Sequence, residues 1–213
     1  MNSQFSRDAI RKTCQLAPII PVLVVHDVAH ARPLAQALVD GGLPALEVTL
    51  RTPAALEVIA EMAAVPGAVV GAGTVLTAED IRAVQAAGAQ FAVSPGATDA
   101  LLTACETVQM PLLPGAASAS EAMVLLERGY DVLKFFPAEA AGGVTMLKSL
   151  GGPLTQVSFC PTGGVNPTNA PDYLKLDNVI CAGGSWVAPT DAMEAGDWKR
   201  IEKLACDASG IGS

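Results

Sequence analysis

The sequence predicts an α/β protein built as a single-domain (β/α)8 TIM barrel. Eight short apolar, β-branched runs recur along the chain, and each ends near Gly, Pro or Thr before an Ala-, Leu- and Glu-rich helical pattern. Strands that are apolar on both faces and alternate with helices are typical of a parallel sheet with helical crossovers. No linker or change in composition divides the 213 residues, so residues 1–213 are expected to form one domain.

The N-terminal half starts with a predicted helical extension, residues 1–18. The strands predicted after it are 19–25, 45–50, 69–75 and 91–95. Gly41 and Gly88 stand where the intervening helices should end, because glycine readily closes a helix C-terminus. Thr77, which is followed by Ala-Glu-Asp, is predicted to cap the helix after the third strand.

The C-terminal half continues the same alternation, with strands predicted at 112–115, 132–136, 157–160 and 179–183. The segment Ser118-Ala-Ser-Glu121 predicts a capping box at a helix start, and Gly129 marks the expected end of that helix. The longest charge-free stretch, 149–171, is rich in Gly, Pro, Thr and Asn. Hydrocarbon does not accept such a segment, so no membrane span is expected.

A doubly wound open sheet is the alternative architecture. Its dinucleotide fingerprint needs three glycines and an acidic residue after the second strand. The segment that runs from Gly71 through Gly73 to Leu76 lacks the third glycine, and no acidic residue follows in the required place. The barrel is therefore the preferred prediction, and in a barrel the functional residues lie at the C-terminal ends of the strands.

The charge balance argues against a nucleic-acid partner. The 21 acidic and 13 basic side chains give a net charge of −8, whereas a nucleic-acid backbone requires a basic surface. A negatively charged substrate would need a local positive site within this acidic field. The five cysteines are odd in number and form no CxxC pair, so neither disulfides nor a zinc site are expected. Together these features predict a protein of the reducing cytoplasm.

The N-terminus superficially imitates a secretory signal, because basic residues precede the apolar stretch 16–25. Asp8 lies among those basic residues, and Pro18 and Pro21 interrupt the apolar stretch. The same stretch is also well explained as a buried first strand, so cleavage is not expected.

Lys134 lies within the apolar strand 132–136, where an ammonium group is costly to bury. Alternation of side chains places Val132, Lys134 and Phe136 on one face. Apolar surroundings lower the pKa of an amine, and a neutral amine can attack a ketone. A lysine that extends to solvent, or that is locked in a structural ion pair, would produce the same pattern.

The second strand favours the catalytic interpretation. Glu47, Thr49 and Arg51 share one face of this strand, whereas its intervening residues are apolar. In a lysine-centred site, Glu47 could move protons and Arg51 could hold a substrate carboxylate in a bidentate contact. An ion pair that fills the barrel interior is the structural alternative.

Glycines follow several of the predicted strands. The third strand ends in Gly-Ala-Gly-Thr74, which admits a ligand close to the backbone and offers a hydroxyl. The seventh and eighth strands end in Gly163-Gly164 and in Gly183-Gly184-Ser185. Loops after the last two strands of barrels commonly bind phosphate through backbone N–H groups. The sequence therefore predicts a phosphate site there.

Seven segments occur in order and at the expected intervals: VLVVHD, ALEVTLRTPAAL, VVGAGTVL, GAQFAVSPGAT, LKFFPAEAAGGV, FCPTGGVNPTN and GGSWVAP. With these segments the chain resembles the family of 2-keto-3-deoxy-6-phosphogluconate (KDPG) aldolases, also described as 4-hydroxy-2-oxoglutarate (KHG) aldolases. The resemblance extends from about residue 20 to about residue 204. It implies a class I, Schiff-base aldolase that assembles as a homotrimer and uses neither metal nor cofactor.

The resemblance also implies roles for individual residues. Lys134 matches the Schiff-base lysine, and Glu47 matches the general acid/base. The remaining matches are Arg51 and Thr74 for the substrate carboxylate, Pro95 and Phe136 for the pocket wall, and Gly163, Gly164, Gly184 and Ser185 for the phosphate. The implied substrate is a phosphorylated keto acid. The alternatives are the phosphogalactonate epimer, a metal-assisted aldolase, and a non-catalytic phosphate-binding barrel.

Overall fold

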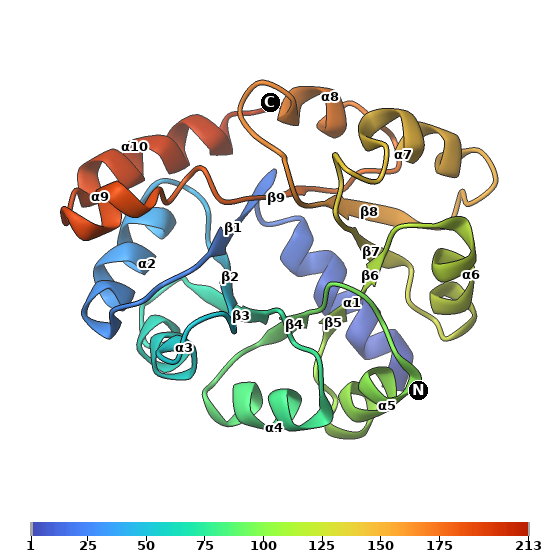
Figure 1. Ribbon diagram of the computed structural model, residues 1–213, viewed down its shortest axis with the longest axis horizontal. Helices are drawn as coiled ribbons and strands as arrows, with labels where there is room; N and C mark the ends of the chain where they lie inside the picture. Colours follow the sequence, from blue (N-terminus) through green and yellow to red (C-terminus); the bar gives the residue numbers. More distant parts are fainter. Residues whose placement is uncertain (1, 213) are drawn as a thin grey trace.

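The computed structural model describes the backbone of residues 2–212, so residues 1 and 213 of the predicted domain lie outside the described residues. The strands are β1 (Ile19–Leu23), β2 (Ala45–Thr49), β3 (Val69–Gly73), β4 (Phe91–Val93), β5 (Leu112–Leu113), β6 (Gly115–Ala116), β7 (Val132–Phe135), β8 (Ser158–Pro161) and β9 (Ala182–Gly184). All strand pairs are parallel, as predicted. The chain is thus a parallel α/β domain whose sheet curls around an interior (Figure 1).

The strands do not form one continuous eight-stranded ladder. They form a six-stranded sheet in the order β5-β4-β3-β2-β1-β9 and a three-stranded sheet in the order β6-β7-β8. β5 and β6 are two halves of the strand predicted at 112–115, and they are separated by Pro114, which has no N–H to donate. Within residues 2–212, the β8 and β9 segments are joined only by the isolated bridges Phe159–Val179 and Thr162–Gly183, in which Val179 and Thr162 lie just outside the two strands.

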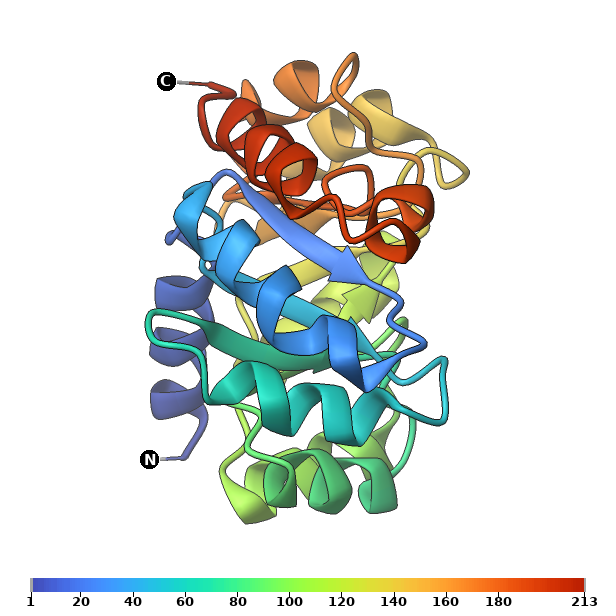
Figure 2. The ribbon, with the colours of Figure 1, turned by 90° about the vertical axis from the view of Figure 1, so that its left-hand side faces the viewer.

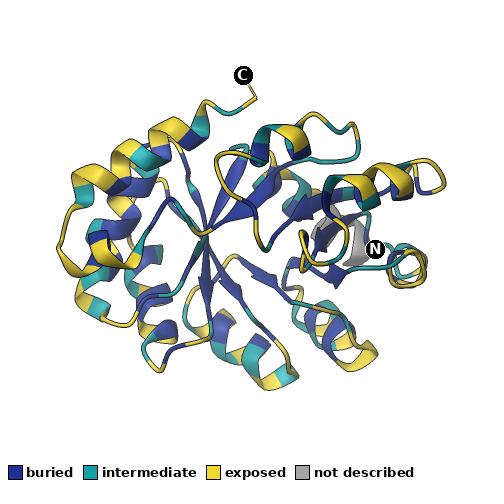
Figure 3. Cartoon of the chain, turned by 45° about the horizontal axis from the view of Figure 1, so that its top comes forward, coloured by how far each residue is buried: buried dark blue, intermediate teal, exposed yellow. Residues whose placement is uncertain are grey.

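Helices surround the strands, and the outer faces of the helices are exposed to solvent (Figure 3). They are α1 (Asn2–Cys14), the 3-10 helix η1 (Val28–His30), α2 (Ala31–Asp40), α3 (Ala55–Ala63), α4 (Ala78–Ala86), α5 (Asp99–Val108), α6 (Ala119–Glu127), α7 (Gly143–Gly151), α8 (Ala170–Leu174), α9 (Thr190–Glu194) and α10 (Trp198–Ser209). Within residues 2–212 no helix is both long and apolar enough to cross a bilayer.

The predicted helix caps are found with one change. Thr77 caps α4 and forms a reciprocal capping box with Asp80. Ser118 caps α6 by accepting a hydrogen bond from the N–H of Glu121 at 3.3 Å. The Glu121 carboxylate, however, accepts from the N–H of Ala117 at 2.8 Å and from the Ser118 hydroxyl at 2.9 Å. Glu121 thus reaches one residue beyond the cap that the sequence pattern predicts.

Two apolar cores result from the alternation of side chains along the strands. The outer core lies between strands and helices and includes Leu133 and Phe135 of β7. The inner core is enclosed by the strands and includes Val132 and Phe91. Ile10 of α1 belongs to the inner core, and α1 lies on the side from which the strand arrows start (Figure 2). The opposite end of the interior is therefore the end that can hold a site.

Candidate active site

Lys134 and Glu47 meet inside the curled sheet. The Lys134 Nζ lies 2.9 Å from the Glu47 Oε1, and the two residues are only 5% and 2% exposed. They come from β7 and β2, on the inward faces that strand alternation predicts. Gly73 on β3 makes room for this contact, because a Cβ there would lie 2.3 Å from the Glu47 Oε1. A buried amine and carboxylate in direct contact can pass a proton between them.

Phe136 closes one side of the lysine. The Lys134 Nζ lies 5.4 Å from the centroid of the Phe136 ring, within the range of a cation–π contact. The same ring faces the loop after β8, because a Cβ on Gly163 would lie 3.4 Å from its edge atoms. Phe136 thus lies between the lysine and the predicted phosphate loop.

Arg51 and Thr74 form a second polar pair at the strand ends. The Arg51 Nε donates to the Thr74 Oγ1 at 3.2 Å. Thr74 has a φ of +61°, which is a strained conformation for a β-branched residue and fixes where its hydroxyl stands. Within the described part of the chain, no carboxylate forms an ion pair with Arg51. Its guanidinium is therefore able to bind an incoming carboxylate.

A cavity of about 210 Å³ opens beside Arg51 and Phe136. Its lining residues are Val22, Val24, Arg51, Phe136, Thr162, Gly163, Gly164, Val165, Gly183 and Ser185. Five of the residues predicted for the site therefore line the same cavity: Arg51, Phe136, Gly163, Gly164 and Ser185. Lys134 and Glu47 are not among the lining residues. The Phe136 ring lines the cavity and also contacts the Lys134 amine, so the lysine lies directly behind this ring.

Three predicted residues are placed differently. Thr74 does not line the cavity, but it accepts a hydrogen bond from Arg51, which does. Pro95 lies beside β6, where its carbonyl oxygen would be 2.2 Å from a Cβ on Gly115, the residue paired with Lys134. Gly184 gives room to an aromatic ring, since a Cβ there would lie 2.0 Å from Trp186. A packing role thus explains this glycine without a ligand.

The loop after β8 turns its carbonyl groups toward the protein. The carbonyls of Thr162 and Gly163 accept from the N–H groups of Ala138 and Glu139 at 2.8 and 3.1 Å. The Gly164 carbonyl accepts from two asparagine side chains, at 3.1 and 3.2 Å. Across residues 2–212, no protein acceptor is found for the backbone N–H groups of Gly164 and Val165. Free N–H groups on a cavity wall are suited to bind an anion.

The chain is similar in sequence and in fold to proteins of known activity. A protein-family model described as KDPG and KHG aldolase matches residues 10–204. The 2-dehydro-3-deoxy-phosphogluconate aldolase of Pseudoalteromonas atlantica is 57% identical over 192 residues, which are 90% of this chain and 89% of that protein. The chain belongs to the KDPG and KHG aldolase family.

Two solved structures show the same fold as this member of the KDPG and KHG aldolase family. The Zymomonas mobilis 2-keto-3-deoxy-6-phosphogluconate aldolase with 3-phosphoglycerate is 50% identical, covers 97% of both chains and gives a TM-score of 0.91. The Legionella pneumophila KDPG aldolase holds pyruvate as a covalent carbinolamine. It is 47% identical and covers 94% of this chain and 98% of its own, with a TM-score of 0.91.

The structure of this KDPG and KHG aldolase family member also adds a residue that the sequence reasoning missed. Thr162 lines the cavity and is 6% exposed. Gly183 leaves space for it, because a Cβ there would lie 2.3 Å from the Thr162 Oγ1. The sequence feature that could have indicated this residue is its position directly before the Gly163–Gly164 pair, where a hydroxyl follows the end of a strand. Within residues 2–212, no cluster of three or more His, Cys, Asp or Glu side chains could hold a metal ion.

Proposed function

We propose that the chain is a class I aldolase that cleaves 2-dehydro-3-deoxy-6-phosphogluconate to pyruvate and glyceraldehyde 3-phosphate. We infer that it also cleaves 4-hydroxy-2-oxoglutarate to pyruvate and glyoxylate. The buried contact between Lys134 and Glu47 carries the proposal, because it joins a nucleophilic amine to a proton carrier beside an anion-binding cavity. The pyruvate carbinolamine of the Legionella relative supports the same chemistry.

The reaction starts when Lys134 gives a proton to Glu47, 2.9 Å away, and attacks the C2 ketone of the substrate. Glu47 returns this proton to the departing C2 hydroxyl, so that the carbinolamine loses water and forms a protonated imine, which withdraws electrons from C3. Glu47 then takes the proton of the C4 hydroxyl, the C3–C4 bond breaks, and glyceraldehyde 3-phosphate leaves. Protonation of the enamine and hydrolysis of the imine release pyruvate and restore the amine. The covalent route replaces one high barrier with several lower ones.

The cavity residues orient the substrate in this proposal. Arg51 and Thr74 hold the carboxylate, and Pro95 and Phe136 form the wall of the pocket. The phosphate binds at Gly163, Gly164, Gly184 and Ser185. The unused N–H groups of Gly164 and Val165 support this placement, because they offer partial positive charge within a chain of net charge −8. Binding of the remote phosphate can then hold C2 at the amine.

The proposal includes the closed eight-stranded barrel and a cytoplasmic location. Counting β5 and β6 as one strand leaves eight strand positions, and the bridges between β8 and the segment before and within β9 support closure. Free thiols support a reducing compartment, because Cys14, Cys160 and Cys181 belong to one inner core and remain unpaired.

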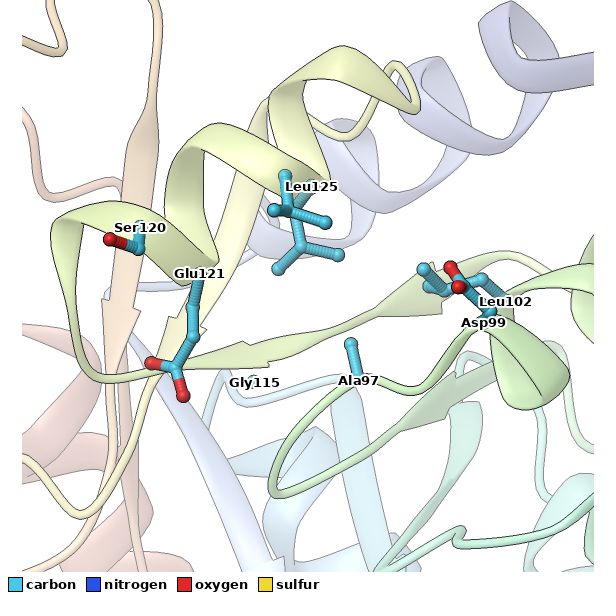
Figure 4. A pocket seen from close by; sticks show the side chains of 8 residues that line it. Ala97, Asp99, Leu102, Gly115, Ser120, Glu121 and Leu125 are labelled. Carbon is cyan, nitrogen blue, oxygen red and sulfur yellow. The ribbon is translucent and has the colours of Figure 1, made fainter.

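The proposal also includes a homotrimer. Exposed apolar side chains support an interface between copies: Met123 and Val124 on α6 are 51% and 52% exposed, and Leu76 is 55% exposed. Val124 also lines a second cavity of about 230 Å³, which lies between α5 and α6 (Figure 4). Sedimentation analysis of the purified chain tests this part. A mass of one protomer at micromolar concentration would overturn it.

Borohydride reduction in the presence of pyruvate tests the enzymatic function. We expect a stable adduct that peptide mapping assigns to Lys134, and no adduct on any of the five other lysines. A chain without an adduct, or with one elsewhere, would refute the Schiff-base mechanism. Rates measured on the two C4 epimers of the phosphorylated substrate distinguish the gluconate from the galactonate specificity. Retention of activity in a chelator separates the mechanism from metal-assisted cleavage.

A further inference from the structure

The turn after β7, residues 136–142, supports the loop after β8 through its backbone. The N–H groups of Ala138 and Glu139 donate to the carbonyls of Thr162 and Gly163. These two bonds draw the carbonyl groups of the loop away from the cavity. The same turn begins at Phe136, which contacts Lys134. One turn therefore contacts both the reactive amine and the loop that carries the unpaired N–H groups of Gly164 and Val165.

A side-chain contact fixes this turn from behind. The hydroxyl of Tyr173 on α8 donates a hydrogen bond to the Glu139 Oε1. Tyr173 is fully buried, with 0% exposure. Burial, followed by the bond to Glu139, raises the pKa of Tyr173 above its usual range. The hydroxyl therefore keeps its proton and remains a donor throughout the pH range in which the chain would work.

Glycines on both sides show how closely this contact is packed. A Cβ on Gly164 would lie 2.5 Å from the Glu139 Cγ, so the loop backbone rests directly on that side chain. A Cβ on Gly143 would lie 3.2 Å from the Tyr173 hydroxyl and 3.3 Å from the Glu139 Oε1. Both glycines have a positive φ, of +80° and +57°. A change in the Glu139 side chain therefore reaches the loop without an intervening layer.

We propose that Glu139 and Tyr173 are positioning residues for the phosphorylated end of the substrate. By holding Glu139 against Gly164, Tyr173 sets where the N–H groups of the loop stand relative to Lys134. The pair lines no wall of the active-site cavity and acts through the loop. The inference rests on the proposed function, and it predicts that the pair matters for substrates with a phosphate and not for those without one.

The variant Tyr173→Phe tests the proposal, because it removes the hydroxyl and keeps the buried ring. We expect its KM for 2-dehydro-3-deoxy-6-phosphogluconate to rise about ten-fold, the effect of one lost hydrogen bond to a charged group, while kcat stays close to the wild-type value. Cleavage of 4-hydroxy-2-oxoglutarate, which has no phosphate, should change by less than about two-fold.

The chain offers a matched control in its other tyrosine. Tyr130 is also buried, at 5% exposure, and burial together with the nearby charge of Glu106 raises the pKa of its hydroxyl. Glu106 binds Arg128 rather than the active-site turn. Tyr130→Phe therefore removes a buried tyrosine hydroxyl away from the active-site turn, and its KM for the phosphorylated substrate should stay unchanged.

Substitutions of the carboxylate complete the test. Glu139→Ala should resemble Tyr173→Phe, Glu139→Gln should recover most of the lost affinity because it keeps an acceptor, and the double variant Glu139→Ala/Tyr173→Phe should be no worse than Glu139→Ala alone. Equal losses on both substrates, no loss on either, or collapse of the Tyr173→Phe fold would overturn the proposal. Pyruvate trapping on wild-type Lys134 separates these outcomes from failure of the proposed function.

Discussion

The two ends of the space inside the strands are filled by opposite kinds of side chain. Under α1, the interior holds apolar groups and thiols, with Phe91 at 1% exposure. Contacts with two other thiols and burial raise the pKa of Cys181 well above 9.0, so it remains protonated. At the other end, Lys134 and Glu47 are equally buried but charged or polar. Burial of apolar side chains thus stabilises the fold at one end, whereas burial of the amine and the carboxylate provides a chemical site at the other.

Two glycines of strand β3 face the two ends of this interior, although they are only two residues apart. A Cβ on Gly71 would lie 2.4 Å from the ring of Phe91. A Cβ on Gly73, one pleat further along, would lie 2.3 Å from the Glu47 Oε1. The same small change on one strand should therefore affect folding at the first glycine and turnover at the second.

Removing the amine is expected to have the largest effect. Lys134→Ala should lower kcat by on the order of 10⁴-fold or more, because no other group can form the imine. It should also lower the free energy of unfolding by about 3–5 kcal/mol, since Glu47 stays buried without its partner. Steady-state kinetics and urea unfolding measure the two effects.

A double substitution checks the stability part of this prediction. Lys134→Met combined with Glu47→Gln removes both charges and should regain most of the lost stability without any activity. If the double variant is as unstable as Lys134→Ala, lost packing and not the unpaired carboxylate is the cause.

The next largest effect is expected for Gly73→Ala. The new methyl group displaces the Glu47 carboxylate from Lys134, and a displacement of about 1 Å costs on the order of 10²-fold in turnover. The free energy of unfolding should fall by less than in Lys134→Ala, because the displaced carboxylate still has Lys134 as a neighbour. Single-turnover imine formation with pyruvate is the appropriate measurement. Unchanged imine formation would show that the 2.9 Å contact is not needed for proton transfer.

Gly71→Ala provides the counterpart at the closed end. Its methyl group would collide with the buried Phe91 ring, and overpacking of this kind lowers the free energy of unfolding by about 1–3 kcal/mol. The activity per folded molecule should remain at the wild-type level. Chemical unfolding combined with active-site titration checks both values. A fall in activity without a fall in stability would contradict the separation of the two ends.

The smallest effect concerns an acidic residue that has a purely structural role although it follows a strand end near the site. The N–H of Ala117 in particular, and also the Ser118 hydroxyl, lowers the pKa of Glu121 below 4.5, against the opposing effect of burial. Its stabilisation is therefore present above the usual pKa and is lost as the pH falls through the lowered value. Glu121→Gln should cost at most about 0.5 kcal/mol at neutral pH, because solvent screens this exposed carboxylate, and less in acid, as measured by unfolding at several pH values.

The face of each strand was the most predictable feature of the site. The two-residue period of 45–51 and 132–136 placed Glu47 and Lys134 in the interior, because alternation is a property of the backbone. Their contact could not be derived from that pattern alone, since it joins residues 87 positions apart and depends on the space left by Gly73.

Other features lie beyond sequence periodicity. The break at Pro114 divides a strand whose apolar pattern continues through it, because proline removes a donor without changing hydropathy. Tyr173 lies on the five-residue helix α8, which is too short to show a period, and its partner Glu139 lies in a turn. The contact between them comes from tertiary packing, and the structure is needed to find it.

The helix that precedes the first strand has a practical consequence for anyone who shortens this protein. Ile10 and Cys14 complete the inner core, and Arg11 reaches Asp131 at 3.2 Å and the Ser158 hydroxyl at 3.3 Å. A version that starts at β1 would open the closed end to water and hydrate Phe91. A minimal enzyme must therefore retain these helical residues, although they lie far from the reacting carbon and contribute nothing to its chemistry.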